Sequence, residues 1–386
     1  MKKMFPVSQF EGLRTPFYYY DMVLLQQTID EMKKALEDKP NYHVHYAVKA
    51  NANKEIIALF RDNGLGCDCV SGGEVNAAIE AGVDANKVVF AGVGKADWEI
   101  EQSLEKDIFC FNVESEPELE VISEIAGRMG KIAKVAIRVN PNVDALTHHY
   151  ITTGLNENKF GISLAHLDKV VDLAVSLENI ELLGLHFHIG SQLLKMEPFE
   201  QLCGRINELQ DNLEKRGINI SLINVGGGLG IDYVNPDENP IPDFANYFDK
   251  FKQNLNLREG QTLHFELGRA LVAQCGNLVS KVLYVKEGVG KKFIILDGGM
   301  SDLIRPALYG SHHNIENISS TSNEKEIYDV VGPICESSDC FGKDENLPLT
   351  KRGDLLVLRS AGAYGQIMAN QYNCRTLPQA VYSTEL

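Results

Sequence analysis

Short apolar runs alternate with helical stretches over the first two thirds of this chain. The first helix is expected to begin after Asp21, a typical N-cap, because apolar residues recur after it at helical spacing from Leu25 to Leu36. The runs that follow are mostly apolar on both faces, as in parallel strands covered by helices. Eight strands are predicted, at residues 43–50, 64–71, 88–92, 108–113, 135–140, 159–163, 183–190 and 223–228. Eight β/α repeats predict an α/β fold built on a TIM-type (β/α)8 barrel.

One junction between a strand and a helix carries a clear local signal. Ser71 and Glu74 have the spacing of a capping box, in which each side chain bonds a free backbone N–H at the start of a helix. The helix that they open is expected to stop at Gly82, because glycine is the usual residue just past a helix end.

The pattern changes after Tyr233. A proline-rich loop is followed by a helix near residues 244–257, and from Gln261 onward strand-like runs dominate. We therefore expect two domains. Residues 22–258 would form the barrel, and residues 259–386 would form a mostly β domain together with residues 1–21, where the sequence FYYY at 17–20 suits a strand.

Polar and glycine residues gather at the carboxyl ends of the predicted strands. In a closed parallel barrel that end carries the active site. The residues are Lys49, Ser71, Asn112, Arg138, Asn140, His188 and the glycines at 226–228.

Lys49, within residues 46–51 (YAVKAN), is the most informative of these residues. A solvated lysine after a strand is common, but a buried amine beside an anionic cofactor becomes a nucleophile that can form an imine. Four later segments add a flat ring partner, phosphate-binding backbone and a carboxylate. They are residues 186–192 (HFHIGSQ), 226–230 (GGGLG), 266–269 (ELGR) and 362–365 (GAYG). Together these features predict a site that holds pyridoxal 5'-phosphate as an electron sink.

Several residues near Lys49 have two interpretations. Asp68 would orient the lysine amine, or it would be a capping or surface aspartate. His188 would lie flat against a cofactor ring, whereas His186 fits a hydrogen-bonded core histidine better. Glu266 stands on an apolar strand and needs a partner, which would be a protonated pyridine nitrogen or, alternatively, the guanidinium of Arg269.

The glycines at 226–228 do not form a dinucleotide-binding motif. Its third glycine would fall on Ile231, and a proline-rich loop follows where that motif needs a helix. Backbone N–H groups at a strand end still suit a phosphate, and the hydroxyls of Ser191 and Tyr364 would add donors. The alternative is a tight turn without a ligand.

Two further clusters bear on the substrate. Arg305 offers a guanidinium suited to bidentate carboxylate binding, with the phenol of Tyr309 nearby in sequence. Cys335 and Glu336 offer a thiol and a carboxylate on a predicted loop. The residues alone leave the role of that thiol open.

The composition narrows the class of protein. The chain has 386 residues, 44% of them hydrophobic and 23% charged, as in ordinary globular proteins. Its formal net charge of −16 argues against nucleic acid or an anionic membrane as a partner. The eight cysteines are scattered, and neither a signal-peptide pattern nor a membrane-length apolar run is found. We expect a cytoplasmic protein.

Seven segments, in this order, resemble the fold-type III pyridoxal-phosphate-dependent decarboxylases. Each motif alone is weak, but seven in order are highly specific, and the match runs from about Thr15 to Arg375. The resemblance implies an alanine racemase-like fold, whose second domain completes the active site and the dimer. The segments are residues 46–51, 186–192, 226–230, 266–269, 305–309, 335–339 and 362–365.

The resemblance also implies roles, position by position. Lys49 would be the Schiff-base lysine and His188 the residue stacked on the ring, and either Cys335 or Lys49 would return a proton to the product. The other cofactor contacts would be Asp68, Arg138, Ser191, Gly227, Gly228, Glu266, Gly268, Arg269 and Tyr364. The substrate contacts would be Arg269, Arg305, Tyr309, Glu336 and Tyr364. No metal is implied.

The substrate implied is meso-2,6-diaminopimelate, decarboxylated to L-lysine. Arg305 and Glu336 would meet the carboxylate and the amine on its distal carbon, and an unpaired arginine would disfavour ornithine. In the family the loop with Cys335 enters the neighbouring subunit's site, so a homodimer is implied. Leu267 and residues 374–378 depart from the family's usual pattern. The alternatives are a decarboxylase of ornithine, arginine or carboxynorspermidine, a metal-dependent barrel hydrolase using His43/His45 or His186/His188, and a non-catalytic pyridoxal-phosphate protein.

Overall fold

The computed structural model describes residues 5–143 and 159–386. The chain divides into two compact units. The first, which we call the barrel unit, comprises Ile29–Gly230 and Asp243–Gly268. The second, the sheet unit, comprises Met1–Thr28, Ile231–Pro242 and Arg269–Leu386.

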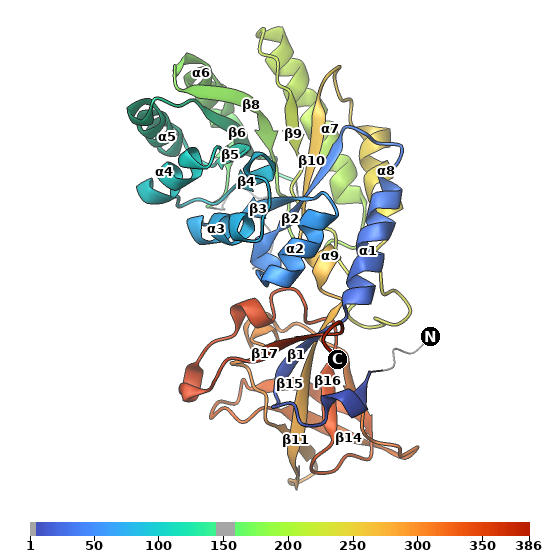
Figure 1. Ribbon diagram of the computed structural model, residues 1–386. Helices are drawn as coiled ribbons and strands as arrows, with labels where there is room; N and C mark the ends of the chain where they lie inside the picture. The colour runs from blue at the N-terminus through green and yellow to red at the C-terminus, as the bar shows by residue number, and fades with distance from the viewer. Residues whose placement is uncertain (1–4, 144–158) are drawn as a thin grey trace. The chain divides into compact units, whose positions relative to one another are not determined.

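Eight parallel strands form a closed ring in the barrel unit (Figure 1). Pairing of β5 with β6 and of β10 with β2 completes the ring, which confirms the predicted (β/α)8 barrel. The strands are β2 (Tyr42–Ala47), β3 (Gly66–Cys69), β4 (Val88–Phe90), β5 (Cys110–Val113), β6 (Ala133–Asn140), β8 (Ile180–His186), β9 (Leu222–Asn224) and β10 (Thr262–Leu267).

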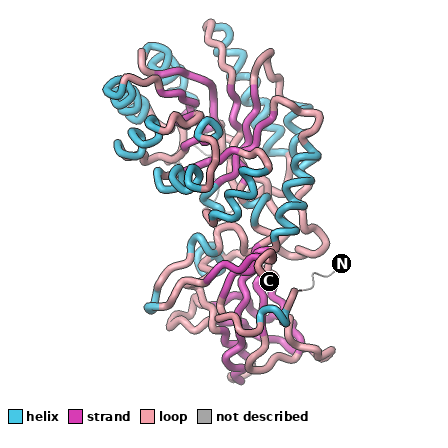
Figure 2. Tube along the Cα trace, viewed as in Figure 1, coloured by secondary structure: helices cyan, strands magenta, loops and turns pink. Residues whose placement is uncertain are grey.

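Helices surround this ring, as the colouring by secondary structure makes plain (Figure 2). Their buried faces are apolar; α2, for example, buries Ile56, Ile57 and Phe60. The longer helices are α1 (Met22–Ala35), α2 (Lys54–Asp62), α3 (Gly72–Glu80), α4 (Asp97–Glu105), α5 (Glu116–Met129), α6 (Leu164–Ser176), α7 (Glu197–Lys215) and α8 (Phe244–Asn254). Short 3₁₀ turns occur at Val7–Phe10 (η1), Val48–Ala50 (η2), Ala85–Lys87 (η3), Gln366–Met368 (η4) and Tyr372–Cys374 (η5).

One predicted strand was assigned wrongly. Only Ile162–Ser163 (β7) is extended in the predicted 159–163 run, and it pairs with the end of β6, while β6 pairs directly with β8. The eighth barrel strand is β10, which the sequence had placed in the β-rich domain. Its Phe265 packs against Tyr247, Phe248 and Phe251 of α8, with ring centroids 4.9–5.7 Å apart.

Because β10 belongs to the barrel, the boundary between the two units differs from the predicted one. The barrel unit continues to Gly268, ten residues beyond the boundary at 258, and Ile231–Pro242 groups with the sheet unit. The proline-rich loop predicts the end of the barrel, because it interrupts the β/α pattern. The chain instead returns to the barrel with α8 and β10.

The capping signal at Ser71 is confirmed in part. The Ser71 hydroxyl accepts a hydrogen bond from the N–H of Glu74 at 3.2 Å, as a helix N-cap does. The Glu74 carboxylate, however, accepts from the N–H of Val70 at 2.8 Å, one residue before the cap. The helix ends at Glu80, and Gly82 follows with a positive φ of +85°.

The sheet unit is mostly β, as expected. Strand β1 (Phe17–Tyr20) pairs antiparallel with β11 and parallel with β17, so the N-terminal FYYY segment does join this unit. Two short helices, α9 (Arg269–Val272) and α10 (Arg305–Tyr309), interrupt the strands. The other strands are β11 (Gly276–Glu287), β12 (Lys292–Leu296), β13 (Ile315–Asn317), β14 (Lys325–Val331), β15 (Cys340–Pro348), β16 (Leu355–Leu358) and β17 (Gln379–Tyr382).

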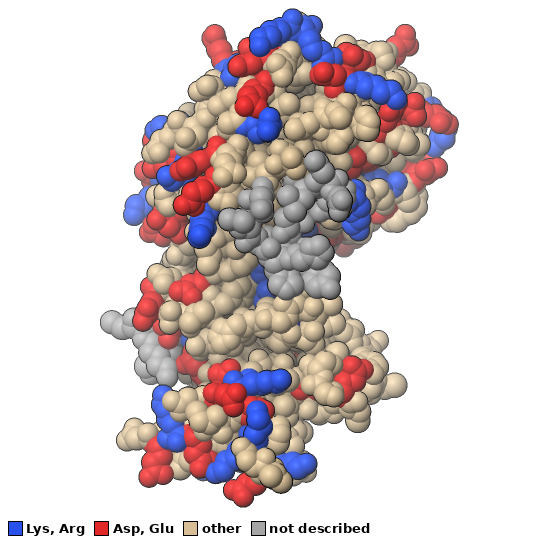
Figure 3. All heavy atoms as spheres, turned by 180° about the vertical axis from the view of Figure 1, so that it is seen from behind, with Lys and Arg blue, Asp and Glu red and all other residues tan. Residues whose placement is uncertain are grey.

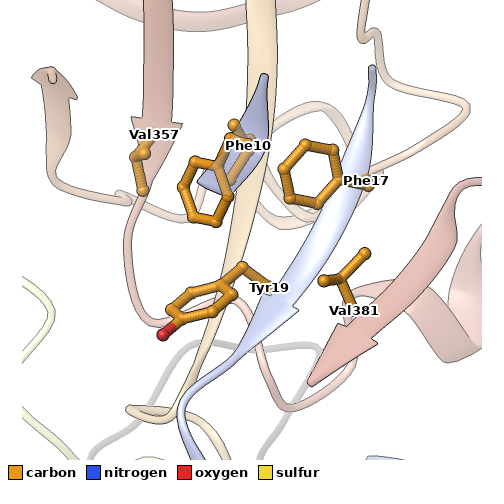
Figure 4. Packing of buried hydrophobic residues seen from close by; sticks show 6 residues of the cluster. Phe10, Phe17, Tyr19, Val357 and Val381 are labelled. Carbon is orange, nitrogen blue, oxygen red and sulfur yellow. The ribbon is translucent and has the colours of Figure 1, made fainter. Parts of the chain in front are cut away.

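A compact apolar cluster holds the strands of the sheet unit together (Figure 4). Phe10 lies between Phe17 and Tyr19, with ring centroids 5.2 Å from each in edge-to-face geometry. Val357 of β16 and Val381 of β17 close the cluster. Burial of these side chains packs the N-terminal segment against the last two strands of the chain.

Acidic and basic side chains are interspersed on the face shown in Figure 3. Across residues 5–143 and 159–386, none of the helices has the length and apolar content needed to cross a lipid bilayer.

Candidate active site

Lys49 lies in the 3₁₀ turn η2, directly after β2, rather than on the strand itself as expected. Its Nζ donates to Asp68 Oδ2 at 2.9 Å, and 34% of the Lys49 side chain is exposed whereas Asp68 is fully buried. Gly268 packs behind this turn, because a Cβ there would lie 3.0 Å from Ala50 Cβ and 3.1 Å from Ala47 Cβ. Of the two interpretations of Asp68, the structure supports the one in which it orients the lysine.

Burial raises the pKa of the Asp68 carboxyl, and the nearby charge of Glu266 adds to the effect. The Lys49 ammonium acts in the opposite direction through its charge and its hydrogen bond. The second carboxyl oxygen, Oδ1, is buried and has no hydrogen-bond partner among the described residues. The Asp68 carboxyl is thus stabilised in its ionised form mainly by Lys49.

Glu266 is held by three donors that lie near the carboxyl ends of β5, β8 and β9. Its Oε1 accepts from the side-chain amides of Asn112 at 3.0 Å and Asn224 at 2.8 Å, and its Oε2 contacts His186 Nε2 at 3.0 Å. Burial by itself raises the pKa of Glu266, but the charge and hydrogen bond of His186 and the charge of Lys49 outweigh burial and leave that pKa below its usual range. Glu266 is therefore a carboxylate.

This arrangement answers the question that the sequence left open for His186, and it gives Glu266 partners that the sequence did not predict. His186 is a buried, hydrogen-bonded histidine, as the sequence predicted. It is one of the groups that form a hydrogen bond with the Glu266 carboxylate. The amides of Asn112 and Asn224 are the others. Of these two asparagines, only Asn112 was among the polar residues predicted at the carboxyl ends of the strands.

His188 follows β8 and presents a neutral imidazole. Its Nδ1 accepts a hydrogen bond from the N–H of Gly227 at 3.3 Å, so the ring proton resides on Nε2. Burial lowers the pKa of His188 well below its usual value, and the positive charges of Arg138 and Lys49 lower it further. A flat, uncharged ring is suited to stacking against another ring.

The three glycines at 226–228 are required by close packing. A Cβ at Gly226 would lie 2.4 Å from Phe187 O, and a Cβ at Gly227 would lie 2.2 Å from Glu266 O. The N–H of Gly226 donates to Asn224 Oδ1 at 2.9 Å, and that of Gly227 donates to His188. Of the three N–H groups expected to face an anion, only that of Gly228 has no partner among the described residues.

Arg138 and Ser191 occupy the expected barrel end. Arg138, in β6, forms a buried ion pair with Glu114 at 2.7 Å, so its charge has a partner within the barrel unit. Ser191 is half-buried in the segment between β8 and α7. Ser71, which belonged to the same predicted group, caps α3 instead.

The sheet unit brings together the other predicted residues around Tyr233. The Arg269 guanidinium donates to the Tyr233 hydroxyl at 2.6 Å and lies over the Tyr364 ring, 4.9 Å from its centroid. Arg305 lies over the Tyr233 ring at 5.0 Å and donates from Nη1 to His313 Nε2 at 2.8 Å. Tyr309 is half-buried at the end of α10. Tyr364 adopts a positive φ of 56°.

Arg305 is a buried cation without a carboxylate partner. In the described ranges no Asp or Glu oxygen forms an ion pair with it, and it is only 5% exposed. Its partner His313 is neutral, because His313 Nδ1 donates to Arg359 O and burial, reinforced by the Arg305 charge, lowers the pKa of His313 to about 3. Neither Tyr233 nor His313 was singled out from the sequence, because neither belongs to a recognisable motif and only the fold brings them to Arg305.

The metal-site alternative finds no support in the described residues. They contain no group of three or more His, Cys, Asp or Glu side chains that could hold a metal ion. His45 and His264 bond each other at 2.8 Å at the opposite end of the barrel, where His45 Nδ1 donates to Lys87 O at 3.0 Å. His186 is engaged with Glu266.

Comparison with known proteins identifies the family. Residues 24–273 match the model of the pyridoxal-binding domain of pyridoxal-dependent decarboxylases. The diaminopimelate decarboxylase of Bacteroides thetaiotaomicron is 60% identical over 386 residues, which cover 100% of both chains. That of Aquifex aeolicus is 40% identical over 362 residues, 94% of this chain and 84% of the relative.

This chain belongs to the diaminopimelate decarboxylase family of pyridoxal-dependent decarboxylases.

Two solved structures share the fold of this chain. The diaminopimelate decarboxylase of Helicobacter pylori complexed with L-lysine superposes with a TM-score of 0.91 and 40% identity, covering 97% of this chain and 93% of that one. The lysine/ornithine decarboxylase of Vibrio vulnificus complexed with putrescine has a TM-score of 0.85 at 23% identity, over 98% and 97% of the two chains, and shows the fold alone. The expected barrel with a mostly β second domain of the alanine racemase-like type is confirmed.

The barrel residues fit the cofactor of this family. Among the buried polar atoms that have no hydrogen-bond partner in the described residues, three belong to side chains that contact Lys49 or Glu266. An unpaired buried polar group costs about 1–3 kcal/mol, so a ligand that supplied partners to these atoms would be stabilised. The atoms are Asp68 Oδ1, Asn112 Oδ1 and His186 Nδ1.

Proposed function

We propose that this chain decarboxylates meso-2,6-diaminopimelate to L-lysine and carbon dioxide, with pyridoxal 5'-phosphate as cofactor. The observation that carries the proposal is the Lys49 amine, held at 2.9 Å by the buried Asp68 within reach of the Glu266 charge. This arrangement joins a primary amine, an ionised carboxylate and a neutral imidazole in the barrel unit. The 60% identity over the full chain to a diaminopimelate decarboxylase supports the reaction.

The barrel residues would hold the cofactor through four kinds of group. Pyridoxal phosphate, when bound, supplies an electron sink for the electron pair left by the departing carboxylate. Lys49 provides the amine for its aldehyde carbon, and Asp68 keeps that amine oriented. Glu266, ionised and fixed by three donors, would keep the ring nitrogen protonated. His188 offers a flat neutral face, and the N–H of Gly228 offers a donor to the phosphate.

Further cofactor contacts are proposed from the family pattern. Gly227 and Gly268 act indirectly, because their missing side chains allow the chain to approach Glu266 and the Lys49 turn. Ser191 and Tyr364 would donate hydroxyl hydrogen bonds to the phosphate. Arg138 would act through its field, since Glu114 already pairs with it. Arg269 would serve both cofactor and substrate.

The sheet unit supplies the groups proposed to select the substrate. Arg305 is a buried guanidinium without an ion-pair partner in the described residues, which favours a ligand carboxylate as its counter-ion. Arg269, Tyr309 and Tyr364 would complete this recognition, and Glu336 would meet the distal ammonium. Ornithine carries no distal carboxylate and would leave Arg305 unpaired.

We also infer a homodimer and a cytoplasmic setting. Cys335 is exposed on its loop and is proposed to return the proton to the product, with Lys49 as the alternative donor. In the family pattern this loop serves the neighbouring subunit. All eight cysteines are free thiols, as in proteins of reducing compartments.

The test is to incubate the purified protein with pyridoxal phosphate and meso-diaminopimelate and to follow lysine and carbon dioxide. The expected result is equal amounts of both products, with no comparable amine formed from L-ornithine. Putrescine release from ornithine at a similar kcat/KM would overturn the substrate assignment. Borohydride trapping followed by peptide mapping should label Lys49, and label elsewhere would overturn the cofactor assignment.

A further inference from the structure

Residues 332–339, the loop after β14, are built around the buried carboxylate of Asp339. Its Oδ1 accepts from the N–H of Met300 at 2.6 Å, and its Oδ2 accepts from the N–H of Ile334 at 2.6 Å. A Cβ at Gly332 would lie 2.4 Å from Asp339 Oδ2, so glycine is required there. Two segments of backbone are thus fixed to one carboxylate, and the loop is a defined turn.

The segment with Tyr372 is fastened to the same stretch of chain. The N–H of Asn370 donates to Ser301 O at 2.9 Å, next to the residue that holds Asp339. The side-chain oxygen of Asn370 accepts from the N–H of Tyr372 at 3.0 Å. On the other side of Tyr372, the Arg375 guanidinium donates to Asp297 O. The loop and this segment are therefore both hydrogen-bonded to the backbone at residues 300–301.

The Glu336 side chain lies where these two parts meet. The Tyr372 hydroxyl donates to Glu336 Oε1 at 2.5 Å, although the two residues are far apart in sequence. The Ser338 hydroxyl lies 3.2 Å from Glu336 Oε2 and 3.5 Å from the Met300 sulfur. Ser338 has one proton to donate, and the carboxylate is the stronger acceptor. Each oxygen of Glu336 thus has its own donor.

We propose that Tyr372 is a positioning residue for substrate specificity: with Ser338, it orients the Glu336 carboxylate that binds the distal ammonium of the substrate. This inference rests on the proposed function, in which Glu336 meets that ammonium. A carboxylate has about four acceptor positions. Two hydroxyl donors occupy two of them and leave the others for an ammonium group.

The physical reason is the freedom of an exposed glutamate. Glu336 is exposed, and its side chain would otherwise populate several rotamers that must be given up when the substrate binds. A hydrogen bond from Tyr372 restricts that freedom before binding. Hydrogen bonding to Glu336 and its negative charge raise the pKa of Tyr372, so the phenol stays protonated and remains a donor at neutral pH.

The experiment compares two ligands that differ only in the group at issue. L-Lysine carries an α-ammonium and an α-carboxylate, and 6-aminohexanoate is the same molecule without the α-ammonium. Binding of each to the enzyme loaded with pyridoxal phosphate would be measured by calorimetry, for the wild type and for Tyr372→Phe. We expect Tyr372→Phe to weaken lysine binding about five- to tenfold and 6-aminohexanoate binding less than about twofold. The KM for meso-diaminopimelate should rise similarly, with kcat within about twofold of the wild type.

Two controls keep the test sharp. Tyr284→Phe changes another exposed tyrosine of the sheet unit and should leave both affinities unchanged. In a Glu336→Gln background, Tyr372→Phe should cause little further loss, because the two residues act through one contact. Equal weakening of both ligands, or full additivity with Glu336→Gln, would overturn the positioning role. If the wild type binds lysine and decarboxylates diaminopimelate but Tyr372→Phe is unaffected, this inference alone fails; a wild type that does not decarboxylate diaminopimelate refutes the proposed function.

Discussion

Buried histidines at the two ends of the barrel differ in how many of their ring nitrogens have hydrogen-bond partners. At the amino ends of the strands, every ring nitrogen of His45 and His264 has a partner: Lys87 O, each other, and the Thr262 hydroxyl at 3.0 Å. At the carboxyl ends, His186 bonds Glu266 through one nitrogen and leaves the other buried and unpaired among the described residues. A completed network stabilises the fold, whereas an incomplete one leaves a polar atom available to a ligand.

Two buried arginines show the same difference between a group with a partner of opposite charge and one without such a partner in the described residues. The buried pair of Arg138 and Glu114 is complete within the barrel unit. Arg305 of the sheet unit is buried with a neutral histidine and a tyrosine ring as its neighbours. Removing a residue of a completed network should lower stability, and removing a residue of an incomplete one should mainly lower activity or affinity.

The largest effect is expected for Lys49→Ala. Loss of the amine should lower kcat at least about a thousandfold, because covalent catalysis depends on it. The free energy of unfolding should fall by only about 1–3 kcal/mol, because the buried Asp68 loses its hydrogen-bonded cation while little packing is disturbed. Carbon dioxide release and urea unfolding measure the two quantities. A variant that keeps a tenth of the activity would contradict the assignment of Lys49.

Arg305→Met should act on substrate affinity. Methionine fills a similar volume without the charge, so the KM for meso-diaminopimelate should rise about tenfold to a hundredfold, the loss expected for a charged hydrogen-bonded contact. Stability should stay the same or rise, because a buried charge without a counter-ion is costly. Steady-state kinetics with melting curves would test both. An unchanged KM would show that Arg305 does not meet the substrate.

His264→Ala probes the completed end of the barrel. The substitution leaves His45 Nε2 without a donor and opens a cavity, so the free energy of unfolding should fall by about 2–4 kcal/mol. The kcat should remain within about threefold of the wild type, because this end lies away from Lys49. Urea unfolding and the carbon dioxide assay are the measurements. A large loss of activity at unchanged stability would contradict a purely structural role for the histidines at the amino ends of the strands.

The most gradual effect is a pH dependence of stability from His45, spread over more than two pH units. Burial lowers the pKa of His45 to about 4, whereas an unfolded histidine has a pKa of about 6.5. The unfolded state therefore binds a proton first as the pH falls, so stability present above about pH 6.5 is lost between about pH 6.5 and pH 4. This loss approaches about 3 kcal/mol. His45→Gln should flatten this part of the stability profile in urea titrations, and an unchanged slope would exclude His45 as its source.

Much of this protein was determined by local sequence. The alternation of apolar runs and helices predicted the barrel, because strand and helix periods are set by the backbone. Lys49, His188 and Glu266 were found as polar groups at the ends of apolar strands, where such residues require a reason. The family motifs added the arginines and the loop with Cys335.

Only the tertiary structure decided which residues meet. Strand β10 was indistinguishable by pattern from the strands of the sheet unit, and its place in the barrel depends on its pairing with β9 and β2. Asn224 binds Glu266 across 42 residues, and Tyr372 binds Glu336 across 36. Contacts of this kind arise from chain crossings that no local periodicity encodes, so sequence supplies the chemical groups and the fold selects their partners.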